Sequence, residues 1–452
     1  MRTSLLLVLL AFFNLTSISQ NPDETVVRQI FDNALLNQDA YNNLTYLCKE
    51  TPGRLLGTEA SMQAIQYFED YFHKLGADTV FRQEFKTKAW KHISTTVSIV
   101  DGEKEIPLRA VALGPSPSTP EFGIAAEILE VMGLDELKAI DPELVKGKIV
   151  FFNRPVDLTN INTFRAYGGA VGQRARGPAL AASLGAAGVL VRSVTTKFDT
   201  VPHSGSTRFD SLRVPCAAIS FVDADLLTQK LSLDKNLKVR MNIQAEDLEE
   251  ITSCNLIADL RGNVYPDEYI VVGGHIDAWY NTPGAHDDGA GCAQSADVMR
   301  IFKELAISNK RTIRVVLFMD EELFQSGSRA FAQYCADNNI SNFLAMETDA
   351  GGFTPVGFMV DADDPIVENF AAYQELLEPY GIYYIQKGGS GVDIDPLKKQ
   401  GVPLIGYRTD SQRYMDIHHS ASDTMDKINI RELQLGSGCM AALIYLIDNY
   451  GY

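Results

Sequence analysis

The pattern of hydrophobic and polar residues divides the chain into an N-terminal, a central and a long C-terminal part. In the N-terminal part, apolar residues recur at helical spacing and then alternate with polar residues, which predicts helices followed by strands. The helices are predicted at residues 24–36 and 58–75, and the strands at residues 79–85 and 92–100. Beyond residue 255, short apolar runs alternate with amphipathic stretches, so strands and helices should follow each other in turn. The apolar runs fall at residues 269–273, 313–319, 343–346 and 403–407.

This alternation predicts an α/β fold in which helices cover a mostly parallel, mixed sheet. The central part has a different pattern of apolar and polar residues. It begins with a linker-like stretch at residues 114–120, contains short apolar strands and is poor in histidine and paired acids. We therefore expect a main domain formed by residues 20–108 and 245–452, with a smaller β-rich domain, residues 109–244, inserted into it.

The N-terminus predicts an export signal. Arg2 precedes an apolar run at residues 5–13, which is too short to span a bilayer of about 30 Å. Ser17 and Ser19 then stand at the two positions that a signal peptidase reads. Residues 1–19 are therefore expected to be a signal peptide, and the protein to be exported, either periplasmic or secreted. No later stretch reaches the roughly 18 consecutive apolar residues of a membrane span, so none is expected.

Charge and cysteine content exclude several classes of function. Lys and Arg number 40 against 58 Asp and Glu, which gives a formal net charge of −18 and argues against nucleic acid as a partner. The six cysteines stand at wide, irregular intervals without the CxxC spacing of a zinc ribbon. We expect at most one or two disulfides, and chemistry that depends on other residues.

Acids and histidines follow the ends of the predicted strands in the C-terminal part. They are His275, the pair Glu321 and Glu322, Asp349 and, further on, His419. Ligands of open α/β sheets bind outside the carboxyl ends of the strands, so these side chains should meet at one edge of the sheet. Asp287 lies in a loop just before a predicted helix and should join them.

This set of side chains is typical of a metal site. Imidazole and carboxylate ligands without thiolates suit Zn²⁺, with Co²⁺ or Mn²⁺ as alternatives. Five candidate ligands fit two metal ions that share a bridging carboxylate. The candidates are His275, Asp287, Glu322, Asp349 and His419. Asp277 can orient the imidazole of His275, whereas His286 and His418 are weaker candidates beside stronger ones.

Several motifs together resemble those of the M28 metallopeptidases. They are GHID at residues 274–277, PGAHDDGAG at 283–291, EE at 321–322, ETD at 347–349 and HSASDT at 419–424. The likeness extends over nearly the whole chain after the leader. Within the insertion, VKGKIV at residues 145–150 and GAAGV at 185–189 are similar to strand segments of a protease-associated (PA) domain.

The resemblance implies a di-zinc peptidase domain with an inserted PA-like domain. It implies that His275 and Asp349 hold one zinc ion, that Glu322 and His419 hold the other, and that Asp287 bridges them. Glu321 would then be the general base, with Asp277 orienting His275. Phe324 and His286 depart from the residues that many relatives carry, Gly and Asp, which leaves the metal ligands intact but weakens inferences about substrate preference.

The leading hypothesis is an exported zinc exopeptidase that hydrolyses short peptides, above all dipeptides with free termini, as a carboxypeptidase or dipeptidase. An M28 aminopeptidase acting on longer peptides is the alternative. A non-catalytic binding protein on the same fold is less favoured, because such a protein should have lost ligands that this chain retains. Residues 389–393 and 410–414 are candidates for the specificity pocket, and a homodimer formed through the insertion is a further hypothesis.

Overall fold

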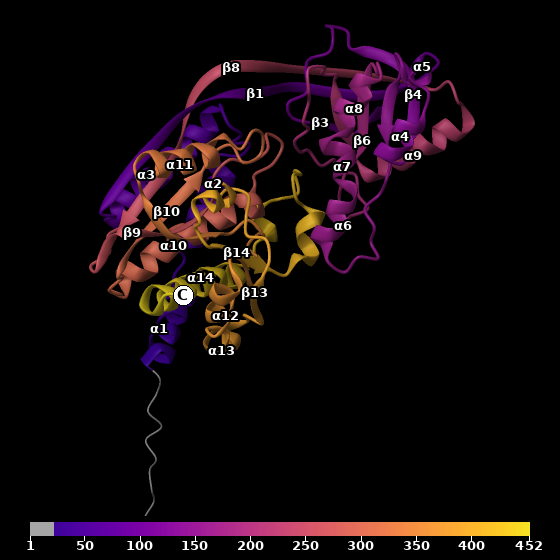
Figure 1. Ribbon diagram of the computed structural model, residues 1–452. Coiled ribbons are helices and arrows are strands. Elements are labelled where there is room, and N and C mark those ends of the chain that lie inside the picture. Colours follow the sequence, from indigo (N-terminus) through magenta and orange to yellow (C-terminus); the bar gives the residue numbers. More distant parts are fainter. Residues whose placement is uncertain (1–21) are drawn as a thin grey trace, which may run out of the picture.

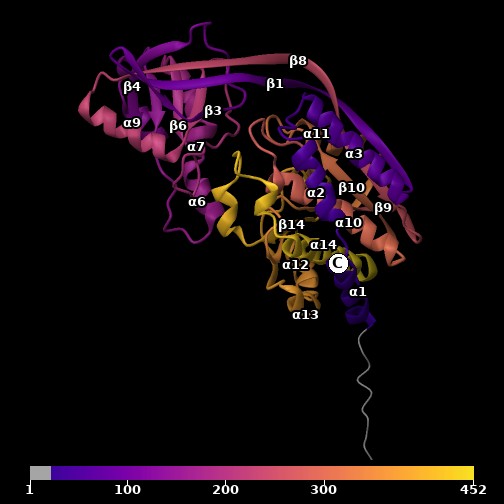
Figure 2. The same cartoon turned by 180° about the vertical axis from the view of Figure 1, so that it is seen from behind.

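One continuous sheet extends through the whole molecule in the computed structural model, which describes residues 22–452 (Figures 1 and 2). The predicted signal peptide lies outside the described residues. The strands follow the order β13-β12-β14-β11-β9-β10-β8-β4-β5-β6-β7-β3, with β1 beside β8 and β2 beside β1. The predicted mixed α/β architecture with a largely parallel sheet is therefore correct.

The main domain is built on four parallel strands in its centre. These are β9 (Tyr265–His275), β10 (Arg311–Phe318), β11 (Ser341–Glu347) and β14 (Leu404–Thr409). Two further strands complete one edge, β12 (Pro355–Asp361), which is antiparallel to β14, and β13 (Tyr384–Lys387). The residues of β9 and β10 are buried along most of their length, as expected for strands covered on both faces.

Alternate strand residues pack into two separate cores, one on each face of the sheet. Ile270 and Val272 of β9 join the larger core, whereas Val271 between them joins the smaller one. Helices α1, α3, α10 and α14 contribute to the larger core, and α11 contributes to the smaller one. The helices of the main domain are α1 (Pro22–Leu36), α2 (Asp39–Glu50), α3 (Glu59–Leu75), α10 (Ala290–Glu304), α11 (Ser326–Asp337), α12 (Asp364–Ala371), α13 (Gln374–Leu377) and α14 (Ile430–Tyr450).

Local signals explain where these helices begin and end. Thr58 caps α3 by accepting a hydrogen bond from the backbone N–H of Ser61, and Gly76 ends the helix in the left-handed conformation. Asn429 caps α14 in the same way, through the N–H groups of Arg431 and Glu432. By length and composition α14 could cross a membrane, yet 72% of its apolar window is buried inside the protein. Its hydrophobicity is therefore that of a core helix.

The insertion contains one end of the continuous sheet and has a core of its own. Its strands are β3 (Ala110–Ala112), β4 (Ile124–Val131), β5 (Ile149–Phe152), β6 (Gly188–Arg192) and β7 (Cys216–Ile219), of which β4 to β7 are parallel. Its helices are α4 (Leu134–Ala139), α5 (Pro142–Val145), α6 (Thr163–Ala170), α7 (Gly172–Ala175), α8 (Gly177–Ser183) and α9 (Phe221–Leu233). The expected strands are present, and several short helices accompany them.

Two long antiparallel strands connect the insertion to the main domain. They are β1 (Thr79–Asp101) and β8 (Lys238–Leu260), which arch from one domain to the other in Figure 1. The sequence predicted two separate strands where β1 is continuous. The register of the pair shifts between Thr87 and Ala89 and again between His92 and Ser94, and such irregularities break the alternation on which the prediction depended. A final strand, β2 (Lys104–Leu108), pairs with the far end of β1.

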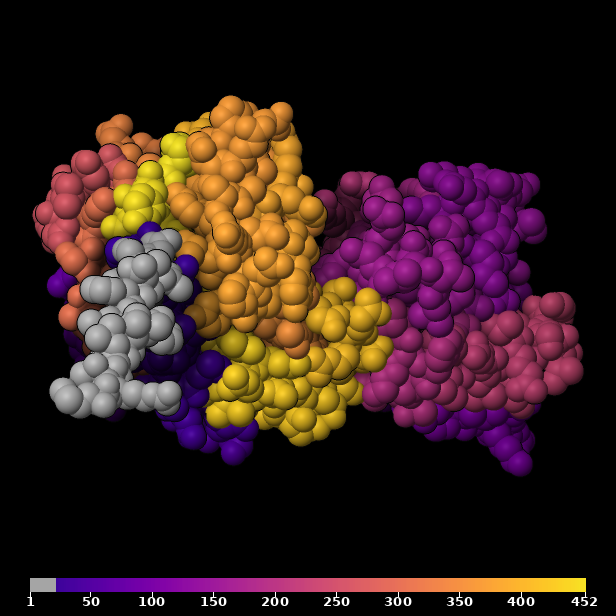
Figure 3. All heavy atoms as spheres, turned by 90° about the horizontal axis from the view of Figure 1, so that it is seen from below, coloured from indigo at the N-terminus to yellow at the C-terminus, as the bar shows by residue number. Residues whose placement is uncertain are grey.

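Two further expectations change in detail. The stretch at residues 114–120 is a packed segment instead of a free linker, because Ser116 and Thr119 are buried and Thr119 bonds to Ile243 of β8. All six cysteines are buried free thiols. On the face seen in Figure 3, segments of the C-terminal part abut the insertion.

Candidate active site

The carboxyl ends of the central strands bring the predicted residues together. Phe318 at the end of β10 lies beside His275 at the end of β9, and Glu347 at the end of β11 lies beside Gly273. The loops that leave these ends carry the paired acids and Asp349 to the same edge. Sequence reasoning placed the cluster at this edge because parallel strands in register end together.

Hydrogen bonds donated by backbone N–H groups fix the loop that carries Asp287. Asp287 lies in η1 (Ala285–Gly289), which leads into α10. The carboxylate of Asp423 accepts hydrogen bonds from the backbone N–H groups of His286 and Asp287, at 2.8 and 3.0 Å. The carboxylate of Asp288 accepts others from His275 and Gly291. The loop therefore presents the Asp287 side chain to the cluster in one orientation.

Asp287 lies between two histidines. Its Oδ1 is 3.2 Å from Nε2 of His275, and its Oδ2 is 3.2 Å from Nε2 of His419. Asp349 Oδ1 lies 3.9 Å from Nε2 of His275, and Glu322 Oε2 lies 3.1 Å from Nε2 of His419. The five side chains thus form two groups, each with one histidine and one terminal carboxylate, on either side of Asp287.

Three buried polar atoms in these groups have no hydrogen-bond partner among the described residues. They are Nε2 of His275, Oδ2 of Asp287 and Oε1 of Glu322. Buried polar groups are normally paired, so unsatisfied lone pairs that face one another require an explanation. A cation bound by these imidazole nitrogens and carboxylate oxygens would explain them, and this donor set suits zinc. The residues present therefore fit a metal centre.

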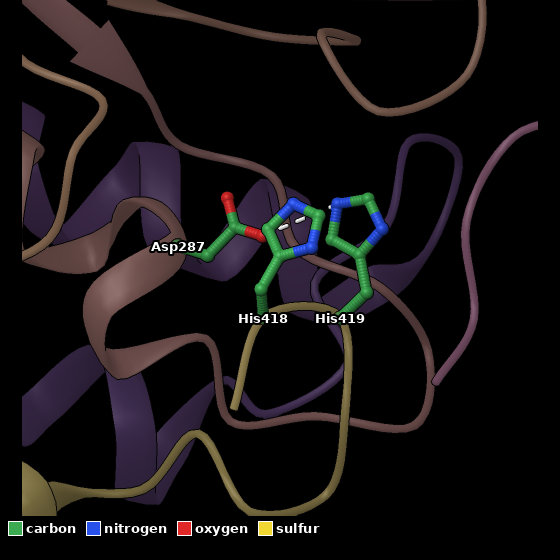
Figure 4. Close-up of side chains that lie close together, drawn as sticks. All are labelled: Asp287, His418 and His419. Carbon is green, nitrogen blue, oxygen red and sulfur yellow. Dashed lines mark ion pairs between the residues drawn. The ribbon is translucent and has the colours of Figure 1, made fainter. Parts of the chain in front are cut away.

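His418 lies closer to this centre than the sequence indicated. Its ring stacks on His419 with the centroids 3.6 Å apart, and its Nε2 is 3.6 Å from Oδ2 of Asp287 (Figure 4). Adjacent side chains usually diverge, but His419 has a positive φ of 60°, and this turn places both rings on the same side. Asp287, His418 and His419 form one possible metal-binding group and His275, Asp287 and Asp349 another.

Asp277 connects His275 with the loop of the paired acids. Its carboxylate accepts hydrogen bonds from the backbone N–H groups of Asp320, Glu321 and Glu322, at 3.0 to 3.3 Å. Its Oδ1 lies 3.6 Å from Nδ1 of His275, and its backbone carbonyl lies 3.1 Å from the same nitrogen. One buried side chain therefore orients an imidazole and positions the loop that carries both acids.

Glu321 lines the cavity next to the metal-binding groups but makes none of their close contacts. Burial raises the pKa of its carboxyl to about 8, with Asp349, Asp277 and Asp287 also raising it and His275 lowering it. A bound cation would favour the charged carboxylate. Glu321 is thus placed to exchange a proton near the metal-binding groups.

The insertion holds the loop that carries His418 and His419. The backbone N–H of Ser204 donates to the carbonyl of His419 at 2.9 Å, and Nδ1 of His203 lies 2.6 Å from the carbonyl of His418. Thr195 donates through its hydroxyl to the carbonyl of Met415. This contact was not predicted from the sequence, because the partners are more than 200 positions apart and the insertion is poor in histidine and paired acids.

Two cavities meet at Asp349. The first, the interdomain cavity, has a volume of about 490 Å³ and is lined by both domains. Its walls are Tyr167, Arg174, Ser206, Arg208, Asp287, Glu321, Glu322, Leu323, Phe324, Gln325, Arg329, Asp349, His418 and His419. The second, the apolar cavity, has a volume of about 640 Å³ and includes Phe164, Val356, Met359, Tyr384 and Val392. Residues 390–392 and 410–411 of the predicted specificity segments line the apolar cavity.

Comparison with known proteins agrees with this geometry. The model of peptidase family M28 matches residues 255–444. Carboxypeptidase Q from Bos taurus is 30% identical over 411 residues, which are 90% of this chain and 85% of that protein. The human protein of the same name is 30% identical over 412 residues, again 90% and 85%.

Solved structures give the same result. The crystal structure of a peptidase M28 precursor from Shewanella amazonensis is 29% identical and aligns with a TM-score of 0.91, covering 95% of this chain and 97% of that one. A zinc aminopeptidase from Bacillus subtilis shares the fold at 19% identity and a TM-score of 0.67, covering 90% and 94%. With this agreement over nearly the full length, the chain belongs to peptidase family M28 and is a metallopeptidase.

Proposed function

We propose that this enzyme is an exported di-zinc exopeptidase that hydrolyses short peptides, above all dipeptides with free termini. The observation that carries the proposal is the position of Asp287, whose two carboxylate oxygens each face the Nε2 of a different histidine at 3.2 Å. A single carboxylate in this position suits two ions rather than one.

Five side chains would hold the two zinc ions. His275 and Asp349 would bind one, His419 and Glu322 would bind the other, and Asp287 would contact both. His418 faces the same oxygen of Asp287 and is a further candidate for contact with the second ion or the substrate. When bound, the ions would polarise the scissile carbonyl and lower the pKa of water toward about 7.

Glu321 would move the proton during hydrolysis. Its carboxylate accepts the proton of the attacking water as the new C–O bond forms at the scissile carbonyl. The same carboxyl then donates this proton to the leaving amine as the C–N bond breaks, which returns Glu321 to its starting charge. Asp277 supports the step by fixing the backbone of Glu321 and the ring of His275.

The arrangement of the two domains supports action on short peptides. Both cavities fall in the range of about 300 to 1,000 Å³ that is usual for small-molecule sites. The interdomain cavity lies between the insertion and the main domain, so the insertion closes one side of the site. An extended polypeptide would need a way past this side, whereas a dipeptide would not.

A panel of dipeptides tests the proposal. Dipeptides with both termini free, their N-acetyl derivatives and their C-terminal amides are assayed with added Zn²⁺ and with a chelator. Hydrolysis only of the unblocked dipeptides, abolished by the chelator and restored by Zn²⁺, is the expected result. Equal hydrolysis of the amides, with none of the N-acetyl derivatives, would identify an aminopeptidase instead. Absence of any hydrolysis in the presence of Zn²⁺ would contradict the proposal.

Export is the second part of the proposal and rests on residues 1–19. Expression of the full chain in a host with a general secretion pathway should yield a mature protein that begins near Gln20, as determined by N-terminal sequencing. Retention of Met1 in the recovered protein would contradict this part alone.

A further inference from the structure

The two walls of the interdomain cavity carry different sets of charged groups. The acids that line it, Asp287, Glu321, Glu322 and Asp349, belong to the main domain, which also contributes Arg329, whose guanidinium donates to the carbonyl of Phe324. The insertion contributes Tyr167, Arg174, Ser206 and Arg208, which are two cations and two hydroxyl groups without an acid. The acids are those proposed to bind zinc or move the proton. The cations on the other wall therefore remain without a role in hydrolysis itself.

Arg174 contacts a side chain of the metal-binding groups directly. It lies in α7, is only 6% exposed, and its Nη1 is 3.4 Å from Nδ1 of His419. The same Nη1 donates to the carbonyl of Ser204 at 3.2 Å, and the guanidinium carbon lies 5.5 Å from the centroid of the Tyr167 ring. These contacts fix the guanidinium at the edge of the site.

The guanidinium of Arg174 is not neutralised by the protein. Its Nε has no hydrogen-bond partner, and no carboxylate of residues 22–452 forms an ion pair with it. Other buried arginines differ: Arg300 pairs with Asp297, Arg314 pairs with Asp259, and Arg54 donates to three backbone carbonyls. An unpaired buried charge is costly, so a site that keeps one is suited to an anion that arrives from outside.

The neighbouring apolar cavity contains an arginine whose hydrogen-bond donors are used by the protein itself. Arg408 lines that cavity, but its guanidinium donates to the carbonyls of Tyr407, Gly389 and Ser390. Its hydrogen-bonding capacity is thus largely used by the backbone. An anionic group of the substrate would find unused donors in the interdomain cavity, and apolar walls in the other.

We propose that Arg174, with Arg208 nearer to solvent in the same cavity, binds the C-terminal carboxylate of the peptide substrate. The inference rests on the proposed exopeptidase function and adds the residues that make a free C-terminus necessary. In a dipeptide, one residue of at most about 3.6 Å separates the scissile carbonyl from the terminal carboxylate. The contact of Arg174 with His419 places the guanidinium within such a short reach, and the fork of an arginine matches a carboxylate.

This assignment also gives the substrate a direction. The residue that contributes the leaving amine lies on the side of the insertion, with its carboxylate at Arg174. The residue on the other side of the scissile bond then faces the apolar cavity beyond Asp349, where Met359 and Tyr384 form part of the wall. An apolar residue in the first position of the dipeptide is therefore preferred.

The test compares a dipeptide with its C-terminal amide. Phe-Ala and Phe-Ala-amide are assayed with the wild type, Arg174→Gln, Arg174→Lys and Arg208→Gln. Loss of a charge-assisted hydrogen bond should lower kcat/KM for Phe-Ala about 10- to 100-fold in Arg174→Gln and less in Arg208→Gln. The value for the amide should change less than threefold, so the acid-to-amide ratio falls. Arg174→Lys should restore part of this ratio because it keeps the charge.

A binding measurement separates recognition from catalysis. In a Glu321→Gln background, the Kd of Phe-Ala measured by calorimetry should rise at least 10-fold on adding Arg174→Gln, with zinc content unchanged. The matched control is Arg176→Gln, two positions along the chain and exposed, which lines neither of the two cavities that meet at Asp349. It should leave both the ratio and the Kd unchanged.

Two results would overturn the assignment. If Arg174→Gln lowers kcat/KM equally for the acid and the amide, or releases zinc, Arg174 only positions His419. If Arg174→Gln fails to fold, an unchanged acid-to-amide ratio in Arg208→Gln overturns it. In either case the wild type would still hydrolyse dipeptides. Absence of wild-type hydrolysis would instead contradict the proposed function.

Discussion

The main domain and the insertion contribute to the site in different ways. The main domain supplies the acids and most histidine contacts from the ends of buried parallel strands, whose positions are fixed by two cores. The insertion supplies no acid to the interdomain cavity, but it supplies two arginines and the hydrogen bonds that hold the His419 loop. In the proposed mechanism, the sheet positions the metal-binding and proton-transfer residues. Recognition of the substrate and the position of the loop that carries His419 then depend on contacts between the two domains.

The contributions of the main domain and the insertion are separated most strongly by a variant that removes only the proposed general base, Glu321. Glu321→Gln should lower kcat about 10²- to 10⁴-fold, because general acid–base catalysis contributes that much. Zinc content, measured by atomic emission, should stay at the wild-type value, since Glu321 makes none of the close contacts of the metal-binding groups. In the control Glu322→Gln, by contrast, zinc should be lost together with activity. A rate near wild type in Glu321→Gln would remove this residue from the mechanism.

Within the main domain, Asp277 fixes both the ring of His275 and the loop of the paired acids. Asp277→Asn should weaken zinc binding about 10- to 100-fold in a competition titration with a chelator, because partners that orient a ligand have effects of this size. An amide cannot accept on both sides as the carboxylate does from Asp320, Glu321 and Glu322. Asp361→Asn, at the end of β12 and paired with Lys398, is the matched control and should bind zinc normally. Equal affinity of the two variants would show that Asp277 is not a positioning residue.

Acid should weaken the contact between His203 of the insertion and the carbonyl of His418. Burial lowers the pKa of His203 to about 4, and Nε2 has no partner among the described residues once Nδ1 bonds to His418. Because the folded-state pKa lies below the ordinary value of 6.5, the unfolded chain binds more protons, and stability is lost as the pH falls from 6.5 toward 4. Between pH 6.5 and 5 the loss from this histidine should be about 2 kcal/mol.

Urea unfolding in EDTA at the two pH values measures this loss without a contribution from zinc. His203→Gln should lose about 2 kcal/mol less than the wild type over the interval. The exposed His73→Gln should behave as the wild type does. Parallel pH dependence in all three proteins would contradict the role of His203.

The smallest expected effect comes from one hydrogen bond between the domains. Thr195→Val removes the hydroxyl that donates to the carbonyl of Met415 at 2.9 Å, and it should lower the free energy of unfolding by about 1 kcal/mol. Ser183→Ala, which removes a hydroxyl bonded within its own helix region, should change it by less than about 0.5 kcal/mol. A stability loss no larger for Thr195→Val than for this control would argue that the contact adds nothing.

The central strands and the edge at which they end could be predicted from the sequence because their signals are local. Apolar runs marked the central strands, and the polar residues that follow each run marked the edge where His275, Glu322 and Asp349 meet. These residues lie at the ends of strands in register, so their convergence follows from topology. The continuous strand β1 was missed because its bulges interrupt the alternation.

The insertion's part in the site could not be predicted in this way. Arg174 and His419 are 245 positions apart, and nothing near Arg174 distinguishes it from a surface arginine. Its role becomes visible only through burial and the lack of a partner, which are properties of the folded chain. His418 was underweighted for a similar reason, because the positive φ of its neighbour is a backbone property that the side-chain pattern does not reveal.

The paired strands β1 and β8 have a mechanical consequence. Because the chain leaves the main domain along β1 and returns along β8, both crossings are bonded to each other over their length. A double-stranded ribbon resists in-plane bending far more than two independent single-chain linkers would, but it still yields to twisting. The ribbon therefore favours relative motions of the two domains that twist it about its axis or bend it out of its own plane. Either motion would change the spacing between the arginines and the acids that line the interdomain cavity.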